Sequence, residues 1–224
     1  MKQMTARLMA LMISTTLLGA CMSTTAMGGG DSWKEEVLLH DGQKMMVERA
    51  VERGGRHEIG QKPDYIKQSL SFTIPGTKQQ TIWEDKFSED LGASNFLPML
   101  LDVRNGVAYL VASPMGCLSY NKWGRPNPPY VVFKYQGKEW QRIPLQELPL
   151  AIKTPNVIFS MPDIEVEKLG TRFVSSEQIR AITARYTHPE YKTILREPTA
   201  KESCPQYSSG PKAPIPIPMS PSPK

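Results

Sequence analysis

Short runs of hydrophobic and polar residues dominate the middle of the chain, and many come in pairs separated by a two-residue turn that contains glycine. The clearest pair runs from Phe96 to Ser113, where Asn105-Gly106 supplies the positive φ angles that a type I′ hairpin turn requires. Both faces of Val107 to Val111 are apolar, so we expect this hairpin in the middle of a pair of sheets. Aromatic and β-branched residues predict a second hairpin from Tyr130 to Leu145, which turns at Gln136-Gly137.

A third hairpin, from Trp33 to Val51 with its turn at Asp41-Gly42, competes with a helix over part of the same segment. Gln43 to Arg53 is rich in helix formers, places Met46 four residues before Ala50 and is followed by two glycines, which is typical of a helix stop. We favour the hairpin, because its Asp-Gly turn matches the turn chemistry of the other two hairpins.

A further strand pair and one helix complete the predicted elements. Ser69 to Ile74 and Gln80 to Asp85 are predicted to be strands on either side of Pro75-Gly76. Ser176 to Tyr186 is predicted to be a helix, because a serine at its start can cap it and apolar side chains recur at helical spacing. Together these elements predict a mainly β fold: an antiparallel sandwich or barrel-like domain built from hairpins, with one C-terminal helix and disordered termini.

Composition sets the limits of this domain. The chain has 224 residues, of which 40 % are hydrophobic, and this fits a single mainly-β domain that we place at residues 33–200. Proline is concentrated at the C-terminus, so residues 205–224 are predicted to be a disordered, Pro-rich tail. The net charge of +5 includes Lys2 and Arg7 of the N-terminal segment, and without them it is 25 minus 22, or +3. So weak a balance, with acidic and basic residues interleaved, argues against a nucleic-acid partner.

The first 21 residues have the parts of an export signal. Met1 to Arg7 is basic, and Leu8 to Leu18 is apolar apart from three hydroxyl residues but too short to cross a bilayer as a helix. The segment ends in Leu18-Gly19-Ala20-Cys21, which resembles the lipobox of bacterial lipoproteins. The resemblance implies that residues 1–20 are a lipoprotein signal peptide and that Cys21 becomes the lipidated first residue of the mature chain. A plain secretory signal with an accidental cysteine is the alternative.

Lipidation at Cys21 would hold the protein to a membrane through its acyl chains. Met22 stands where an aspartate is associated with retention in the inner membrane of many Gram-negative bacteria, so the resemblance implies an outer-membrane anchor that faces the periplasm. Residues 21–32 are small and polar and include three consecutive glycines, which is typical of a flexible tether between the anchor and the domain.

Two cysteines, Cys117 and Cys204, remain after Cys21. Export would place them in an oxidising compartment, where a disulfide between them is allowed. A buried Cys117 with a free Cys204, or pairing between chains, are the alternatives that the sequence leaves open. No base stands near either cysteine in the sequence, so we predict no catalytic thiol.

The segment from Cys117 to Tyr130 joins two apolar strands and combines aromatic, basic and proline residues. Such residues on a stiff loop present a large contact area at low entropic cost, which is typical of a recognition surface. The candidate binding residues are Tyr120, Lys122, Trp123, Arg125 and Tyr130. The competing interpretation is that Trp123 folds back as a lid on the sandwich while the prolines end the strands.

No motif identifies a reaction, a metal or a cofactor. The three histidines, His40, His57 and His188, are widely separated, and the chain contains no HExxH, CxxC, acidic calcium loop, GxSxG or phosphate-binding glycine loop. We therefore predict no catalytic residue, no metal site and no cofactor. The expected function is that of a non-enzymatic envelope lipoprotein that binds a protein or an envelope component, for example as an immunity-type inhibitor. The alternative is an envelope-acting hydrolase whose site is assembled from distant residues.

Overall fold

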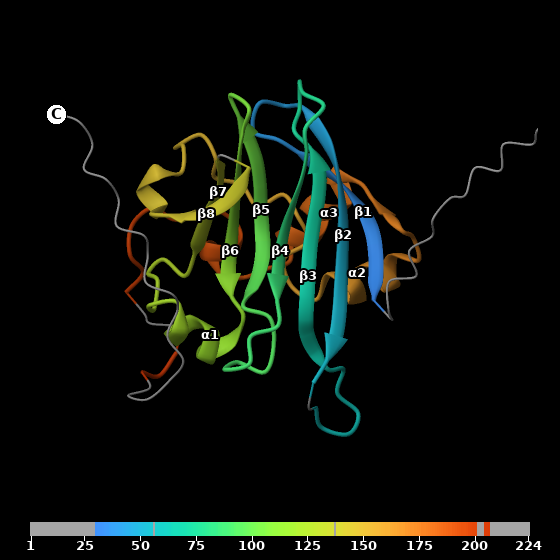
Figure 1. Cartoon of the computed structure of the whole chain (residues 1–224), viewed down its shortest axis with the longest axis vertical. Helices are drawn as coiled ribbons and strands as arrows, with labels where there is room; N and C mark the ends of the chain where they lie inside the picture. The colour runs from blue at the N-terminus through green and yellow to red at the C-terminus, as the bar shows by residue number, and fades with distance from the viewer. Residues whose placement is uncertain (1–29, 56, 137, 201–203, 207–224) are drawn as a thin grey trace, which may run out of the picture.

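A computed structural model describes residues 30–55, 57–136, 138–200 and 204–206 of the chain. In this part the protein is mainly β, and its strands form two sheets that pack face to face (Figure 1). The predicted sandwich is therefore confirmed. The predicted signal peptide, Cys21 and all but the first two residues of the predicted tail lie outside the described residues. Asp31 and Ser32, assigned to the tether, belong instead to the first strand.

The five-stranded sheet contains both hairpins predicted from the N-terminal half. Its spatial order is β4-β3-β2-β1-β9, with antiparallel pairing except for the short parallel pair of β1 and β9. The strands are β1 (Asp31–Leu38), β2 (Lys44–Gly54), β3 (Asp64–Thr73), β4 (Gln80–Lys86) and β9 (Phe173–Val174).

The segment that resembled a helix is strand β2. Its buried positions alternate with exposed ones from Met45 through Val47 to Val51, and this period of two puts the apolar side chains on one face. The hairpin prediction is confirmed, because pairing with β1 buries this face, whereas a helix would have spread the same side chains around its circumference.

The four-stranded sheet has the order β5-β6-β7-β8 and is antiparallel throughout. Its strands are β5 (Phe96–Arg104), β6 (Val107–Pro114), β7 (Val131–Gln136) and β8 (Glu139–Ile143). The β5–β6 hairpin turns at Asn105-Gly106 as predicted. In the β7–β8 hairpin, Gln136 pairs with Glu139, so the two turn residues lie one position later than predicted.

In the described part of the chain, three helices and two short 3₁₀ turns fill the connections, two helices more than the sequence predicted. They are α1 (Gly116–Lys122), α2 (Pro162–Leu169), α3 (Ser176–Ala184), η1 (Leu145–Glu147) and η2 (Pro189–Tyr191). The predicted helix is α3, and Ser175 caps it in a capping box with Gln178. The first two helices have only seven and eight residues, which is too short for a periodic apolar stripe to reveal them.

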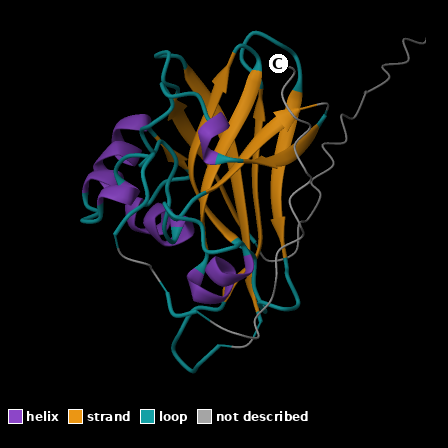
Figure 2. Cartoon of the chain, turned by 90° about the vertical axis from the view of Figure 1, so that its left-hand side faces the viewer, coloured by secondary structure: helices purple, strands orange, loops and turns teal. Residues whose placement is uncertain are grey.

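The buried side chains form three clusters. The largest lies between the two sheets, the second lies on the far side of the four-stranded sheet beneath residues 148–159 and 194, and the third lies between the five-stranded sheet and α2 and α3. The four-stranded sheet is consequently covered on both faces, while the five-stranded sheet is covered on one. Figure 2 shows most helices on one side of the strands, one at their lower end and a short one in front of their upper part, whereas strands and their turns form the opposite side of the described residues.

Glu35 on β1 and Arg49 on β2 form a fully buried ion pair, with 3.1 Å between Oε1 and Nη1. The two side chains also bind the main chain of Ile158. Arg49 donates to the carbonyl oxygen of Ile158 at 2.5 Å, and the backbone N–H of Ile158 donates to Glu35 at 3.1 Å. Trp33 donates its indole N–H to the same carboxylate at 2.8 Å. The pair therefore fixes the segment before α2 against the inner face of the five-stranded sheet.

Replacing Glu35 by Leu should lower the free energy of unfolding by about 3–5 kcal/mol, because it leaves the Arg49 charge buried without its counter-charge. Urea denaturation provides the measurement. Glu48→Gln is the matched control, since Glu48 adjoins Arg49 on β2 but pairs with Lys34 in solvent. This variant should lower the free energy of unfolding by less than about 1 kcal/mol. Equal losses for the two variants would contradict the assigned role of the buried pair.

Candidate functional site

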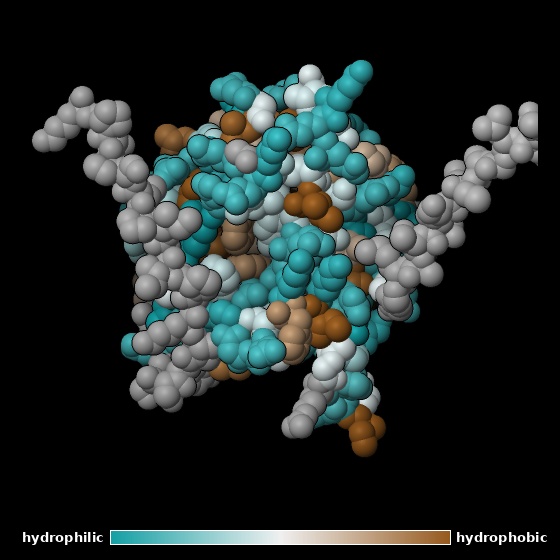
Figure 3. All heavy atoms as spheres, viewed as in Figure 1, coloured by the Kyte–Doolittle hydropathy of each residue, from teal (hydrophilic) through white to brown (hydrophobic). Residues whose placement is uncertain are grey.

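The outer side of the five-stranded sheet is a functional candidate, and we call it the open face. The strand registers place its outward side chains in rows across the sheet. The two central rows are Ile82, Ser71, Glu48, Lys34 and Phe173, and Glu84, Ser69, Ala50 and Ser32. No described residue covers this face, which points toward the viewer in Figures 1 and 3.

The centre of the open face is a recess of about 750 Å³. Its floor consists of small side chains, including Ala50, Ser69 and Ser71, while Ile82 and Phe173 stand at opposite margins and are nearly half exposed. Long polar side chains are the usual covering of a solvated sheet face, so small residues here leave the strands accessible. Figure 3 shows hydrophobic groups at separate points among hydrophilic and neutral ones on this side of the molecule.

Charges of both signs border the recess and pair with each other. Lys34 lies 3.4 Å from Glu48, and Lys67 lies 3.6 Å from Glu84. The open face therefore combines apolar contact points with a balanced charge, which suits the surface of another protein better than a polyanion.

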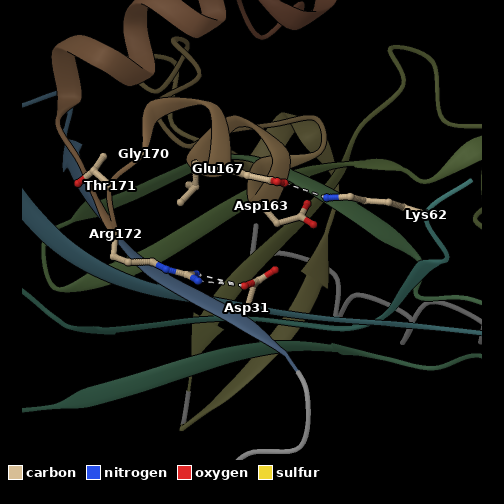
Figure 4. Close-up of a pocket in the computed structure, with 8 residues that line it drawn as sticks. Asp31, Lys62, Asp163, Glu167, Gly170, Thr171 and Arg172 are labelled. Atoms are coloured by element: carbon tan, nitrogen blue, oxygen red, sulfur yellow. Dashed lines mark hydrogen bonds and ion pairs between the residues drawn. The ribbon is translucent and has the colours of Figure 1, made fainter.

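A second recess, of about 550 Å³, lies beside α2 and is lined mainly by charged residues (Figure 4). Arg172 donates to Asp31 across one side, and Lys62 donates to Glu167 across the other. Asp163 projects from the first turn of α2 and is almost fully buried. The charged groups that line this recess thus already have partners within the chain.

Asp163 has a structural role in the floor of that recess. Arg53 binds it in a bidentate manner through Nε and Nη2, at 2.8 and 2.9 Å, and the Tyr65 hydroxyl donates to it as well. Burial alone would raise the pKa of Asp163, but the hydrogen bonds from Arg53 and Tyr65 outweigh it and lower the pKa. The carboxylate therefore stays ionised and joins α2 to the end of β2 and the start of β3.

His40 and Asp102 form a close pair, with 2.6 Å between Nδ1 and Oδ2. Such a pair occurs in catalytic triads, where the second ring nitrogen faces a nucleophile. Here the Nε2 atom of His40 accepts the backbone N–H groups of Lys153 and Thr154, at 3.0 and 2.8 Å. This nitrogen is occupied, so the pair connects the β1–β2 turn to β5 and to the segment after η1.

The predicted binding residues lie in a folded segment in which each side chain contacts the rest of the chain. Tyr120 and Tyr130 are buried, and Trp123 is half-buried against the cluster between the sheets. The Trp123 ring lies 4.5 Å from that of Phe96, and its N–H donates to Asn95 at 3.1 Å. The geometry therefore favours the lid interpretation of Trp123 over the binding-loop interpretation.

The two basic residues of this segment also contact the chain itself. Lys122 donates to Asp90 at 2.8 Å, and Arg125 donates to the carbonyl oxygen of Cys204 at 2.8 Å. Cys204 in turn forms a disulfide with Cys117 at the start of α1. Lys122 thereby holds α1 to the β4–β5 connection, while Arg125 and the disulfide hold the 204–206 segment against α1.

Asn95 connects the Trp123 lid to β4. Its side-chain N–H donates to Asp85 at 2.9 Å, and Asp85 also accepts the backbone N–H groups of Asn95 and Phe96, both at 2.7 Å. Burial raises the pKa of Asp85 to about 6, although these hydrogen bonds favour the ionised form. Asp85 lies in the interior and organises the β4–β5 connection under the lid.

Comparison with protein-family models, with curated proteins and with solved structures gives no match for this chain. Within residues 30–200 and 204–206, apart from the undescribed positions 56 and 137, no group of three or more His, Cys, Asp and Glu side chains is placed to hold a metal ion. None of the helices in the described part of the chain has both the length and the apolar character needed to cross a membrane.

Replacing Trp123 by Ala should lower the free energy of unfolding by about 3 kcal/mol, because it removes the ring packed on Phe96 and leaves Asn95 with one partner fewer. Thermal unfolding is the measurement. Trp123→Phe keeps an aromatic ring but loses the hydrogen bond, and should cost about 1 kcal/mol. An unchanged melting temperature in Trp123→Ala would show that the side chain is not a lid.

Proposed function

We propose that this chain is a lipid-anchored protein of the bacterial cell envelope that binds a partner protein through the open face. The observation that carries the proposal is the asymmetry of the five-stranded sheet. Its inner face is covered by the second sheet and by α2 and α3, whereas its outer face presents a recess with apolar margins. Exposed apolar groups around a recess are typical of protein-binding surfaces.

The anchor part of the proposal is supported by the lipobox resemblance of Leu18 to Cys21 and by the short apolar run before it. A protein partner is supported by the paired charges on the open face, because a polyanionic polymer would call for an excess of basic side chains there.

Substituting Ser69 by Arg should abolish partner binding, because the new side chain fills the recess between Ala50 and Glu84. We expect at least a tenfold loss of the partner captured from detergent-solubilised envelopes, quantified by mass spectrometry after cross-linking. The melting temperature should stay within about 2 °C of the wild type, because the site faces solvent.

Thr73→Arg is the matched control. Thr73 lies on the same strand and the same face, four residues further along and outside the recess, and it is exposed. This variant should capture the partner as the wild type does. Equal capture by Ser69→Arg and the wild type, or the absence of any specific partner from repeated experiments, would overturn the proposed binding function.

Replacing Cys21 by Ser should release the protein from membranes or leave its precursor unprocessed, because the acyl chains are attached through the cysteine sulfur. Metabolic labelling with a radioactive or clickable fatty acid, followed by membrane fractionation, measures both effects. Acyl labelling that persists in Cys21→Ser would contradict the lipidation site. Loss of labelling with the open face still binding its partner would show that the two parts of the function are separable.

A further inference from the structure

Three large hydrophobic side chains are exposed at one end of the sandwich, although they belong to three different connections. Ile59 is fully exposed in the loop between β2 and β3, Phe87 directly follows β4, and Leu118 lies on α1. Phe87 and Leu118 are each about half exposed, at 50 % and 46 %. We call the end formed by these three connections the loop end. Figure 1 shows the β2–β3 loop protruding below the strands, and Figure 3 shows a hydrophobic group at its tip.

Hydrogen bonds and strand pairing bring these connections to the same end. The β2–β3 loop leads into Tyr65, whose carbonyl oxygen accepts the N–H of Ser94 in the β4–β5 connection at 2.7 Å. Pro114, which precedes α1, pairs with Phe96, which follows that same connection. At the opposite end, the described residues of the four hairpin turns themselves include no exposed large hydrophobic side chain, and Leu38, which precedes the β1–β2 turn, is the one beside them, at 41 % exposed.

The N-terminal segment enters the fold at the loop end. β1 begins at Asp31, which pairs with Val51 three residues before the end of β2. The ten residues from Cys21 to Gly30 span at most about 35 Å when fully extended. An acyl chain on Cys21 would therefore keep the loop end within a few tens of ångströms of the bilayer surface.

We propose that the loop end docks on the membrane that carries the anchor, with Ile59, Phe87 and Leu118 entering the lipid interface; this rests on the proposed lipidation of Cys21. Moving apolar side chains from water to the level of the lipid headgroups lowers the free energy. A lipid surface can accept three separate points of contact without a complementary pocket. Lys86, next to Phe87, is exposed and can keep its ammonium group at the headgroups. The docked protein holds its strands upright and its open face sideways, accessible from the periplasm.

The test uses the mature chain that begins at lipidated Cys21, purified in detergent and reconstituted into vesicles of phosphatidylethanolamine and phosphatidylglycerol. A single cysteine labelled with an environment-sensitive fluorophore is introduced by Glu58→Cys, beside the loop tip, or by Lys78→Cys, in the exposed β3–β4 turn at the opposite end. Flotation of the vesicles reports anchoring, and quenching by an aqueous collisional quencher reports insertion. We expect quenching at residue 58 to fall at least threefold in vesicles, quenching at residue 78 to stay unchanged, and Ile59→Asp to restore quenching at residue 58.

The outcomes separate docking from anchoring. If the protein floats with the vesicles but the two labels are quenched equally, docking of the loop end is contradicted, whereas the lipid anchor is supported. If the protein does not float, the anchor is wrong and the docking proposal falls with it. If the label at residue 58 is protected from the quencher without lipid, and if this protection increases with protein concentration, the loop end contacts a second copy of the chain. That result also overturns the proposal.

Discussion

The buried pair of Glu35 and Arg49 determines which face of the five-stranded sheet is free. Both side chains hold the main chain of Ile158, so the inner face of β1 and β2 is committed to the segment that leads into α2. Because side chains alternate along a strand, their neighbours Lys34 and Glu48 must point outward. A shift of β1 by one residue would bury Lys34 and expose Glu35, and a shift of β2 would bury Glu48 and expose Arg49. The register and the open face therefore depend on the same ion pair.

Other polar contacts reinforce this arrangement. The side chain of Asn156 donates to the carbonyl oxygens of Leu38 and Leu101 and accepts the N–H of Leu101, and His40 accepts N–H groups from the same segment. The chain between η1 and α2 has little regular structure, yet it is hydrogen-bonded to both sheets. Glu35 and Arg49 of the five-stranded sheet bind the backbone of Ile158, and the side chain of Asn156 binds the backbone of Leu101 in the four-stranded sheet.

The hairpins could be predicted because their causes are local: a glycine-containing turn and the alternation of the flanking side chains. The role of the Cys117–Tyr130 segment could not, since an aromatic and basic segment has the same composition whether it binds a partner or covers a core. The contacts that favour the lid interpretation are made to Asn95 and Cys204, which are distant in sequence. The open face was missed for a similar reason. Serines at alternate positions of β3 were a visible signal, but only the pairing with β2 and β4 brings Ser69 and Ser71 into one recess.

The two proposed surfaces are compatible because they lie at right angles on the sandwich. The strands run from the loop end to the hairpin turns, so docking of the loop end on a bilayer sets the strands upright and turns the open face away from the lipid. A tether that entered at the hairpin turns would instead pull charged and glycine-rich residues toward the membrane. With a lipid anchor on Cys21, the entry of the chain at Asp31 would place the apolar connections toward the membrane and leave the recess around Ser69 free for the proposed partner.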